Sequence, residues 1–196
     1  YVNPKNAGEE GKPIVYRSEQ IKAAHITGAE SIKNWEKFEG DVWVTRIKNS
    51  FFGDYNPYKT LVSGDWFIAY MIAHTGDVFL NEKSMYEVTS LDSVKKPEVF
   101  IPSWDQEFSV YTWYTEQDEK NDETVIYANF QGKNPNEEDV EISVRQDCFL
   151  PEAEGINYIT LSGFKVSKAA TQWAPPTAYQ DGMIGPHWSK GWVIED

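Results

Sequence analysis

The segment that decides the fold runs from residue 156 to residue 196 and reads INYITLSGFKVSK, AATQWAPPTAYQDGMIGPHWSKGW and VIED in succession. Gly163–Phe164 and Gly191–Trp192 each place a glycine beside an aromatic residue just before an aliphatic residue, and a short strand is predicted at each of these two places. The central stretch has neither a helical nor an alternating pattern, and its three tryptophans argue against disorder. A loop of this length is therefore predicted to be functional.

Short strands with glycine corners recur elsewhere in the chain. Residues 140–145 alternate apolar and polar side chains, and residues 13–17 and 24–28 fit the same pattern. Strands repeated at intervals of about twenty residues, with loops between the copies, are typical of a parallel β-helix. An ordinary antiparallel sheet is the alternative that the pattern leaves open.

The pattern changes between residues 36 and 138, where antiparallel strands are predicted. Asn81, Glu82 and Lys83 predict a tight turn, and several short strands with such turns favour a β-sandwich. The expected strands cover residues 41–48, 66–73, 77–80, 84–88, 108–115 and 123–130. Because β-helix features occur on both sides, we predict an all-β chain in which the sandwich is inserted into the helix.

The predicted domains follow from this arrangement. Residues 1–35 form the first β-helix rungs, residues 36–138 form the inserted antiparallel β-sandwich, and residues 139–196 continue the rungs and carry the long aromatic loop at 170–190. The chain starts at Tyr1 without a methionine and stops at Asp196 within a predicted strand. We therefore expect it to be a piece of a longer protein, since a β-helix leaves unpaired backbone at an uncapped end.

Composition limits the partners. The net charge of −13 and the lack of a basic patch argue against nucleic acid, and no apolar run is long enough for a membrane helix. A neutral carbohydrate is compatible with this charge. Cys148 is the single cysteine, so no disulfide can form within the chain, and we expect it to be a core residue. The cellular location is left open with the cytoplasm favoured, and self-association of the full-length protein is also left open.

Several unusual segments, in order, resemble the bacterial β-xylosidases of glycoside hydrolase family 120. They are 49-NSFFGDYNPY-58, 64-GDW-66, 76-GDVFLN-81, 124-TVIYANFQG-132, 174-APPTA-178 and 188-WSKGW-192. The resemblance implies a right-handed parallel β-helix, only part of which is present here, with a β-sandwich inserted near its N-terminus. It also implies an enzyme that degrades xylan fragments by releasing xylose from xylo-oligosaccharides with retention of configuration, and it makes this chain roughly the first third of that enzyme.

No catalytic residue is predicted within the chain. Retaining glycosidases need a nucleophilic carboxylate and an acid/base carboxylate about 5 to 5.5 Å apart. In the family that the chain resembles, both are expected on later rungs, beyond Asp196. Glu195 and Asp196 cannot form the pair, because adjacent residues of a strand point to opposite faces. Whether this chain alone is an enzyme is therefore doubtful, and substrate binding is its expected contribution.

The candidate substrate-binding residues are Trp66, Asp65, Trp173, His187 and Trp188. An indole face packs well against the C–H groups of a pyranose ring. Trp66 matches a family segment in which an aromatic residue borders the xylose site, and its alternative is a place in the sandwich core. Asp65 has a turn-stabilising role as its alternative. The alternative for Trp173 and Trp188 is packing of the loop, and His187 occupies a variable position of a family segment.

The remaining tryptophans are not predicted to bind a ligand, and the histidines are not predicted to bind a metal. Five tryptophans are expected in the core or at a domain interface: Trp35, Trp43, Trp104, Trp113 and Trp192. The three histidines are far apart and show no zinc-type spacing, so no metal and no cofactor is predicted. Calcium remains open, because its oxygen ligands leave only a weak pattern in a sequence.

Two other functions fit the same features. Aromatic loops on a β scaffold equally suit a non-catalytic carbohydrate-binding or adhesion module. A polysaccharide lyase fragment is the second alternative, but a lyase that acts on uronates should offer a basic groove. The chain has only 18 lysine and arginine residues, thinly spread, which places the lyase last.

Overall fold

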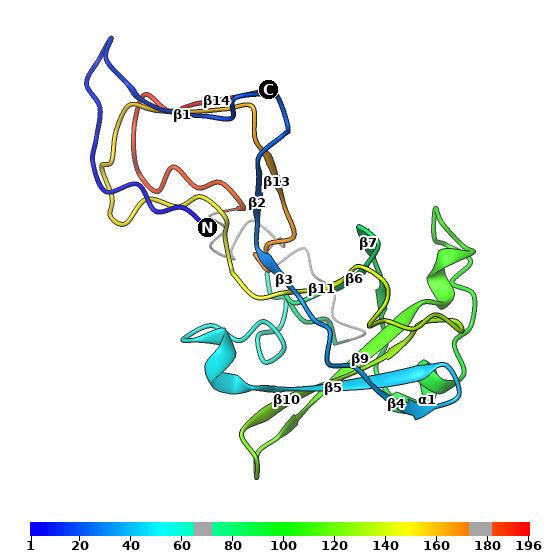
Figure 1. Cartoon of the computed structure of the whole chain (residues 1–196). Coiled ribbons are helices and arrows are strands. Elements are labelled where there is room, and N and C mark those ends of the chain that lie inside the picture. Colours follow the sequence, from blue (N-terminus) through cyan, green and yellow to red (C-terminus); the bar gives the residue numbers. More distant parts are fainter. Residues whose placement is uncertain (65–71, 173–181) are drawn as a thin grey trace. The chain divides into compact units, whose positions relative to one another are not determined.

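The computed structural model describes residues 1–64, 72–172 and 182–196, and most of the secondary structure in them is β-strand (Figure 1). The chain divides into two units. Unit 1 comprises Tyr1–Gly28, Ser63–Phe67 and Arg145–Asp196, and unit 2 comprises Ala29–Val62 and Ile68–Val144. The all-β prediction is confirmed: α1 (Leu91–Lys95) is the only α-helix in the described ranges, beside two 3-10 turns at Asn49–Phe52 and Phe108–Val110. None of these helical segments has the length or apolarity to cross a membrane.

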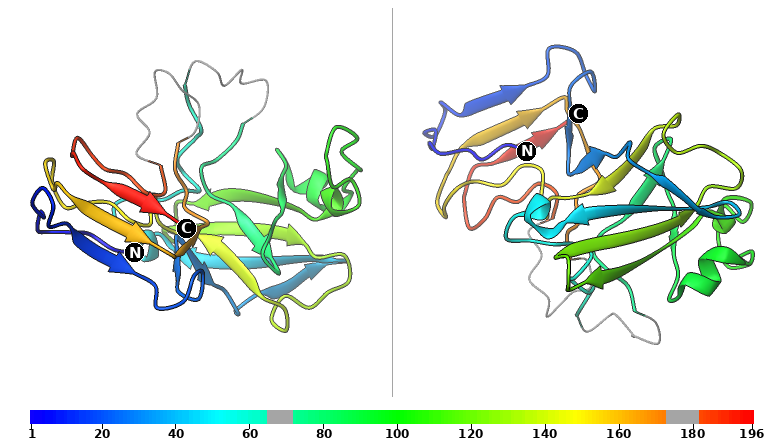
Figure 2. Two further views of the ribbon diagram at one scale, coloured as in Figure 1. Left: turned by 90° about the horizontal axis from the view of Figure 1, so that it is seen from above. Right: turned by 60° about the horizontal axis from the view of Figure 1, so that its bottom comes forward.

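Unit 1 is built from short parallel strands. Strand β12 lies between β1 and β14 in one sheet (Figure 2). In a second sheet, β13 pairs with β2. Parallel bridges also join Phe149 to Val2 and to Ile184. The strands are β1 (Ile14–Arg17), β2 (His25–Thr27), β12 (Ile159–Ser162), β13 (Lys165–Ser167) and β14 (Val193–Glu195). This pairing rules out an ordinary antiparallel sheet for these strands, and it is the pairing that the β-helix hypothesis requires.

An aromatic column lies in the core of unit 1. The ring of Phe149, which is fully buried, contacts Tyr16 and Trp192 edge-on, with centroids 5.2 and 5.8 Å away. Trp192 is fixed in turn, because its indole N–H donates to the carbonyl of Ile156 at 2.7 Å. Cys148 is buried in the same cluster, as expected, and burial raises the pKa of its thiol to about 11. The thiolate form is therefore scarce at neutral pH, and Cys148 acts as a core side chain.

Unit 2 contains two sheets. A five-stranded sheet has the order β4-β5-β10-β9-β8, and a four-stranded sheet has the order β3-β11-β6-β7. All neighbours are antiparallel except β8 and β9. The strands are β3 (Ala29–Ser31), β4 (Glu36–Glu39), β5 (Val42–Lys48), β6 (Val78–Leu80), β7 (Lys83–Ser84), β8 (Tyr86–Glu87), β9 (Thr112–Asp118), β10 (Glu123–Asn129) and β11 (Val140–Ser143).

Strand β10 carries the core of unit 2 on both of its faces. Ile126 and Ala128 point into a cluster that also contains Val78 and Leu80 of β6 and Val140 and Ile142 of β11, so the two sheets pack against each other. Val125 and Tyr127 point the other way, into a cluster that α1 covers with Val94. Successive residues of a strand face opposite sides, and the four consecutive apolar residues at 125–128 of β10 therefore predict burial on both.

The structure corrects several predicted strands. The expectation that residues 140–145 begin a β-helix copy is wrong, since β11 pairs antiparallel with β3 and β6. The first part of the expected strand 108–115 is a 3-10 turn. The expected strand 84–88 is divided between two sheets, because β7 pairs with β6 and β8 with β9. The expected strand 66–73 falls largely outside the described residues.

The predicted turn at residues 81–83 is confirmed. Asn81 and Glu82 both have positive φ, 50° and 71°, between paired strands β6 and β7. Two successive residues in the left-handed region are what a two-residue hairpin of this kind needs. Asn is among the residues that tolerate this conformation, which explains why the turn is readable from the sequence.

The double-sided burial of β10 gives a stability prediction. Ile126 is fully buried, so Ile126→Ala is expected to lower the free energy of unfolding by about 2 to 5 kcal/mol through lost contacts and the cavity that remains. Ile101 is 69% exposed and serves as the matched control, with an expected change within about 0.5 kcal/mol for Ile101→Ala. Chemical denaturation of both variants checks this. Equal losses in the two variants would contradict the assignment of Ile126 to the core.

Candidate carbohydrate-binding site

Three of the five predicted sugar-binding residues, Asp65, Trp66 and Trp173, lie outside the described residues. The residues just before them in the chain, Ser63 and Gln172, are described. The backbone amide of Ser63 donates to Oε1 of Gln172 at 2.9 Å. Because Asp65 and Trp66 follow Ser63 closely and Trp173 follows Gln172 directly, this hydrogen bond joins the starting points of both predicted aromatic segments. Nothing in the sequence pattern indicates that residues 109 positions apart meet here.

The chain on either side of residues 65–71 is held by antiparallel pairing in unit 2. The amide of Val62 donates to the carbonyl of Ala73 at 2.9 Å, and the amide of Thr75 donates to the carbonyl of Thr60 at 2.9 Å. An isolated bridge joins Leu61 to His74 between these two bonds. The described chain before residue 65 and after residue 71 is therefore paired with itself at Thr60–Val62 and Ala73–Thr75.

His187 and Trp188 lie in the loop that ends at Trp192. Both have left-handed backbone conformations, with φ of 48° and 57°. Trp188 is 80% exposed, and His187 is half-buried. The loop is anchored on both sides of Trp188, because Ile184 forms its bridge to Phe149 and the amide of Lys190 donates to Oδ1 of Asn157 at 2.8 Å. Trp188 does not pack the loop against the core of unit 1, and its indole is available for a ligand.

The other tryptophans divide into two groups. Trp35 and Trp113 are almost fully buried, Trp43 is half-buried against the same cluster, and Trp192 belongs to the core of unit 1, as predicted. Trp104 was also expected in the core or at a domain interface, and the prediction of a core position is wrong. Its side chain is as exposed as in an extended peptide, at 105% of the reference area. Prolines and polar residues around Trp104 give the sequence signal for a surface turn that outweighs its apolar character.

A half-buried acidic residue, Asp77, lies directly before β6. Asp77 accepts hydrogen bonds from the amide of Val78, at 2.8 Å, and from the hydroxyl of Ser84. Burial raises the pKa of Asp77 to about 7, and the nearby charge of Glu87 acts in the same direction. The hydroxyl of Tyr58 donates to the carbonyl of Asp77 at 2.7 Å, and burial raises the pKa of that tyrosine as well. Sequence reasoning picked out residues 76–81 only through the family resemblance and gave Asp77 no role.

Glu87, whose charge acts on Asp77, is itself in contact with His74. Glu87 accepts from the amide of His74 at 2.8 Å and contacts the ring nitrogen Nδ1 at 2.5 Å. Both side chains are largely buried, with 16% and 14% of their area exposed. The contact fixes the carboxylate of Glu87 at the end of β8. His74 lies in the described chain shortly after residues 65–71, so its contact with Glu87 fixes this part of unit 2.

The described residues contain one group of carboxylates close enough to share a cation. Oxygens of Glu82, Asp139 and Glu141 lie within 4.8 Å of one another beside the turn at residues 81–83. Oxygen ligands of this kind suit calcium. Two of the three residues are exposed, and an exposed acidic cluster does not by itself define a metal site.

Comparisons with known proteins place this architecture. An all-β chain in which a unit of two mainly antiparallel sheets interrupts, in sequence, a unit of parallel strands defines the structural class. The family model for the glycoside hydrolase 120 insertion domain matches residues 32–142. The solved structure described as the complex structure of XylC with xylose matches all of this chain with 47% identity and a TM-score of 0.91. No curated protein matches.

The chain belongs to glycoside hydrolase family 120. The matched insertion domain lies almost wholly within unit 2, Ala29–Val62 and Ile68–Val144, which gives the two antiparallel sheets their place in the family. The chain spans 32% of the length of the XylC chain. The family resemblance seen in six short sequence segments is thus confirmed.

The raised pKa of Asp77 predicts a pH-dependent stability. The folded pKa of about 7 lies above the ordinary 3.8, so the folded state holds this proton more tightly. Its stabilising effect is complete below about pH 4 and is lost as the pH rises through 7. We expect the free energy of unfolding to fall by about 2 to 4 kcal/mol over this range, at about 1.4 kcal/mol per pKa unit.

Two variants isolate this effect in denaturation curves between pH 4 and 8. Asp77→Asn is expected to remove most of the decrease, because the amide carries no charge to bury. Asp105→Asn is the control, since Asp105 is exposed and its ion pair with Lys83 lowers the pKa. It should keep the decrease of the unchanged chain. A similar decrease in Asp77→Asn would show that another group is responsible.

Proposed function

We propose that this chain is the N-terminal portion of a retaining glycoside hydrolase that releases xylose from xylo-oligosaccharides, and that it contributes aromatic side chains to substrate binding. Membership of glycoside hydrolase family 120 supports the hydrolase class. The similarity to XylC, whose structure is described as a complex with xylose, supports the sugar. We also propose that the parallel strands of unit 1 are part of a right-handed β-helix.

The hydrogen bond between Ser63 and Gln172 carries the proposed role in binding. It joins the two segments in which sequence analysis places Trp66 and Trp173. A sugar ring offers an apolar face to an indole and hydroxyl groups around its edge, so tryptophan beside hydrogen-bonding groups is suited to it. Two aromatic segments that start at one point can contact one substrate. Asp65 is the proposed acceptor for a sugar hydroxyl, and Trp188 and His187 are further proposed contacts.

The proposed mechanism assigns the bond-breaking step to residues outside this chain. Retention requires a carboxylate that forms a glycosyl–enzyme intermediate and a second that first donates a proton to the leaving group and then activates water. The described residues carry no assigned pair of this kind. Their proposed contribution is to hold the xylose ring, so that binding energy orients the scissile bond toward the two carboxylates.

The proposed function predicts the activity of the whole polypeptide and its stereochemistry. The whole polypeptide that contains this chain is expected to hydrolyse an aryl β-xyloside and to release the β-anomer of xylose first, which proton NMR detects before mutarotation. The isolated 196-residue chain is expected to show no enzymatic turnover. Initial release of the α-anomer would contradict retention. Turnover by the isolated chain, abolished by mutation of one of its own acids, would contradict the absence of catalytic residues.

The proposed role of Trp66 can be tested in the whole polypeptide. Trp66→Ala removes the proposed stacking surface, worth about 1 to 3 kcal/mol, and should lower kcat/KM for xylobiose by roughly five- to hundredfold. The melting temperature should change little. Trp104→Ala is the control, because Trp104 is a fully exposed tryptophan outside the proposed substrate site. Unchanged kinetics with an intact fold would defeat the stacking role, and a large loss of stability would place Trp66 in the core.

A further inference from the structure

An exposed apolar segment lies in unit 2, in the part of the chain that joins α1 to β9. Residues 99–104, which we call the apolar segment, read VFIPSW and contain no charged side chain. Four of them are large and exposed: Val99, Phe100, Ile101 and Trp104. A single exposed apolar side chain is ordinary, but a group of them in one short stretch of surface marks an interaction site.

The apolar segment is held in place by hydrogen bonds on both sides of its tryptophan. The amide of Ser103 donates to the carbonyl of Phe100 at 2.9 Å, which closes a tight turn. The hydroxyl of Ser103 is hydrogen-bonded to Tyr86 of β8 and accepts from the amide of Asp105 at 2.9 Å. Trp104 lies between these two fixed residues with its side chain fully exposed. A segment ordered in advance loses little conformational entropy on binding.

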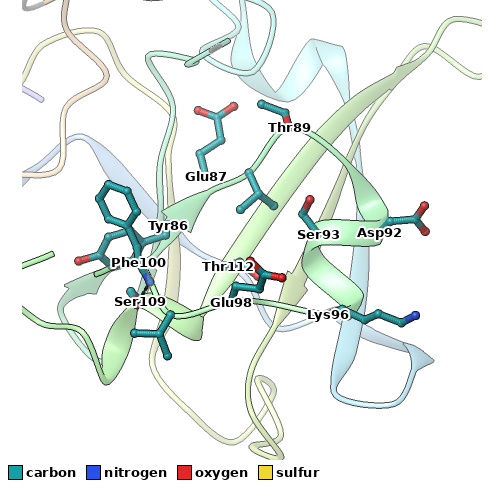
Figure 3. Close-up of a pocket in the computed structure, with 12 residues that line it drawn as sticks. Tyr86, Glu87, Thr89, Asp92, Ser93, Lys96, Glu98, Phe100, Ser109 and Thr112 are labelled. Carbon is teal, nitrogen blue, oxygen red and sulfur yellow. Dashed lines mark hydrogen bonds between the residues drawn. The ribbon is translucent and has the colours of Figure 1, made fainter. Parts of the chain in front are cut away.

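The same segment lines a pocket of about 740 Å³ (Figure 3). Val99 and Phe100 belong to its lining, together with residues of α1, β8 and β9. Figure 3 shows Tyr86 and Phe100 on one side of the pocket and Asp92 of α1 on the other. Pockets of about 300 to 1,000 Å³ hold whole small molecules, so this one has room for a side chain of another molecule.

The lining suits the indole ring of a tryptophan. The rings of Tyr86 and Phe100, whose centroids are 6.4 Å apart, offer an aromatic wall for edge-to-face contact. Asp92 and Glu98 also line the pocket, and both are exposed, so their carboxylates are accessible acceptors. An indole has one N–H to donate and no acceptor. An aromatic wall beside exposed carboxylates therefore matches both parts of this side chain.

We infer that the face formed by the apolar segment and this pocket is a two-fold interface between copies of the polypeptide, in which Trp104 of each copy enters the pocket of the other. In a two-fold interface the same surface of both copies must carry a projecting group and the site that receives it. This face carries both, since Trp104 directly follows Ser103, which is bonded to Tyr86 in the pocket lining. A different protein, or another part of the polypeptide, would need only one of them.

The charges at the two ends of the apolar segment agree with a two-fold pair. The chain has a net charge of −13, so copies repel unless they meet through a surface with little charge, which the apolar segment provides. Exposed Lys96 precedes the segment and exposed Glu107 follows it. Within the described residues neither of them forms an ion pair. A two-fold axis through the segment runs the two copies antiparallel, which brings Lys96 of one copy toward Glu107 of the other.

The available area is compatible with a stable dimer. Such a dimer buries about 800 Å² on each partner. A buried aromatic side chain contributes about 150 to 250 Å², so Trp104, Phe100 and their aliphatic neighbours supply on the order of half of this area, and the pocket rim supplies the rest. Binding energy is concentrated in a few central aromatic residues. Trp104 is therefore expected to dominate, and Ile101, which does not line the pocket, to contribute little.

The test measures the molar mass of the whole polypeptide by sedimentation velocity over a range of concentrations. Trp104→Ala is expected to halve the mass of the assembly, with a dissociation constant raised about tenfold or more. Trp188→Ala is the matched control, because it removes another exposed tryptophan, in unit 1, and should leave the assembly intact. The circular dichroism of Trp104→Ala should match that of the unchanged protein, since the exposed side chain does not support the fold of its own copy.

A charge exchange tests the two-fold arrangement itself. Lys96→Glu and Glu107→Lys are each expected to weaken the assembly, because each places like charges opposite one another. The double variant is expected to recover the assembly, since each copy then presents the exchanged pair to the other. Failure of the double variant to recover would contradict the two-fold arrangement.

Other occupants of this face give different results. A whole polypeptide that sediments as a single chain would overturn the inference. If acrylamide then failed to quench the fluorescence that Trp104→Phe removes, the apolar segment would be covered by a part of the polypeptide outside this chain. An assembly that is unchanged in Trp104→Ala, or that is lost equally in Trp188→Ala, would also overturn the inference. Because the test does not use hydrolysis of a xyloside, failure of the interface and failure of the proposed function are detected separately.

Discussion

The burial of β10 on both faces is the constraint on which unit 2 depends. A strand that is apolar at successive positions cannot lie at a surface, so each face of the sheet needs a cover. The second sheet covers Ile126 and Ala128, and α1 covers Val125 and Tyr127. The amide side chain of Asn129, at the end of β10, donates to the carbonyl of Val94 in α1 at 2.8 Å and is itself buried. The single turn of helix is thereby fixed to the sheet.

The pocket of unit 2 follows from the same constraint. Because α1 is held against the outer face of the sheet, a space remains between it and the chain that returns to β9. Thr112 and Tyr86 are opposite each other in the parallel pair of β9 and β8, so strand register places both residues beside this space. The requirement to cover an apolar strand has thus left a concave surface on unit 2.

The sequence predicts where the strands of this fold lie better than it predicts which strands pair with each other. The strands predicted at residues 41–48 and 123–130 are present as β5 and β10, and Asn81 marks a turn because it tolerates a positive φ. Alternation is the same for parallel and antiparallel strands, however, and this is why residues 140–145 were assigned to the wrong type of sheet. Pairing partners depend on contacts between distant residues, which a local pattern does not encode.

Residues with unusual properties are predictable only where their chemistry is visible in the chain. Trp188 was a candidate for ligand contact because prolines and glycine flank it, and the structure shows its side chain to be exposed. Asp77 and Thr112 were missed, because an aspartate before a strand and a threonine within one are ordinary in a sequence. Their unusual properties, a raised pKa and an unpartnered hydroxyl, come from burial. The contact between Ser63 and Gln172 was likewise invisible, since neither residue type indicates a distant partner.

The central claim is that this chain binds substrate for a hydrolase whose catalytic carboxylates lie elsewhere. A crystal structure of the whole polypeptide with a sulfur-linked xylobiose in its catalytic site tests it most directly. We expect the sugar to contact Trp66 and the segment that follows Gln172, together with two carboxylates from beyond Asp196. A sugar in the catalytic site that contacts no residue between Tyr1 and Asp196 would contradict the account.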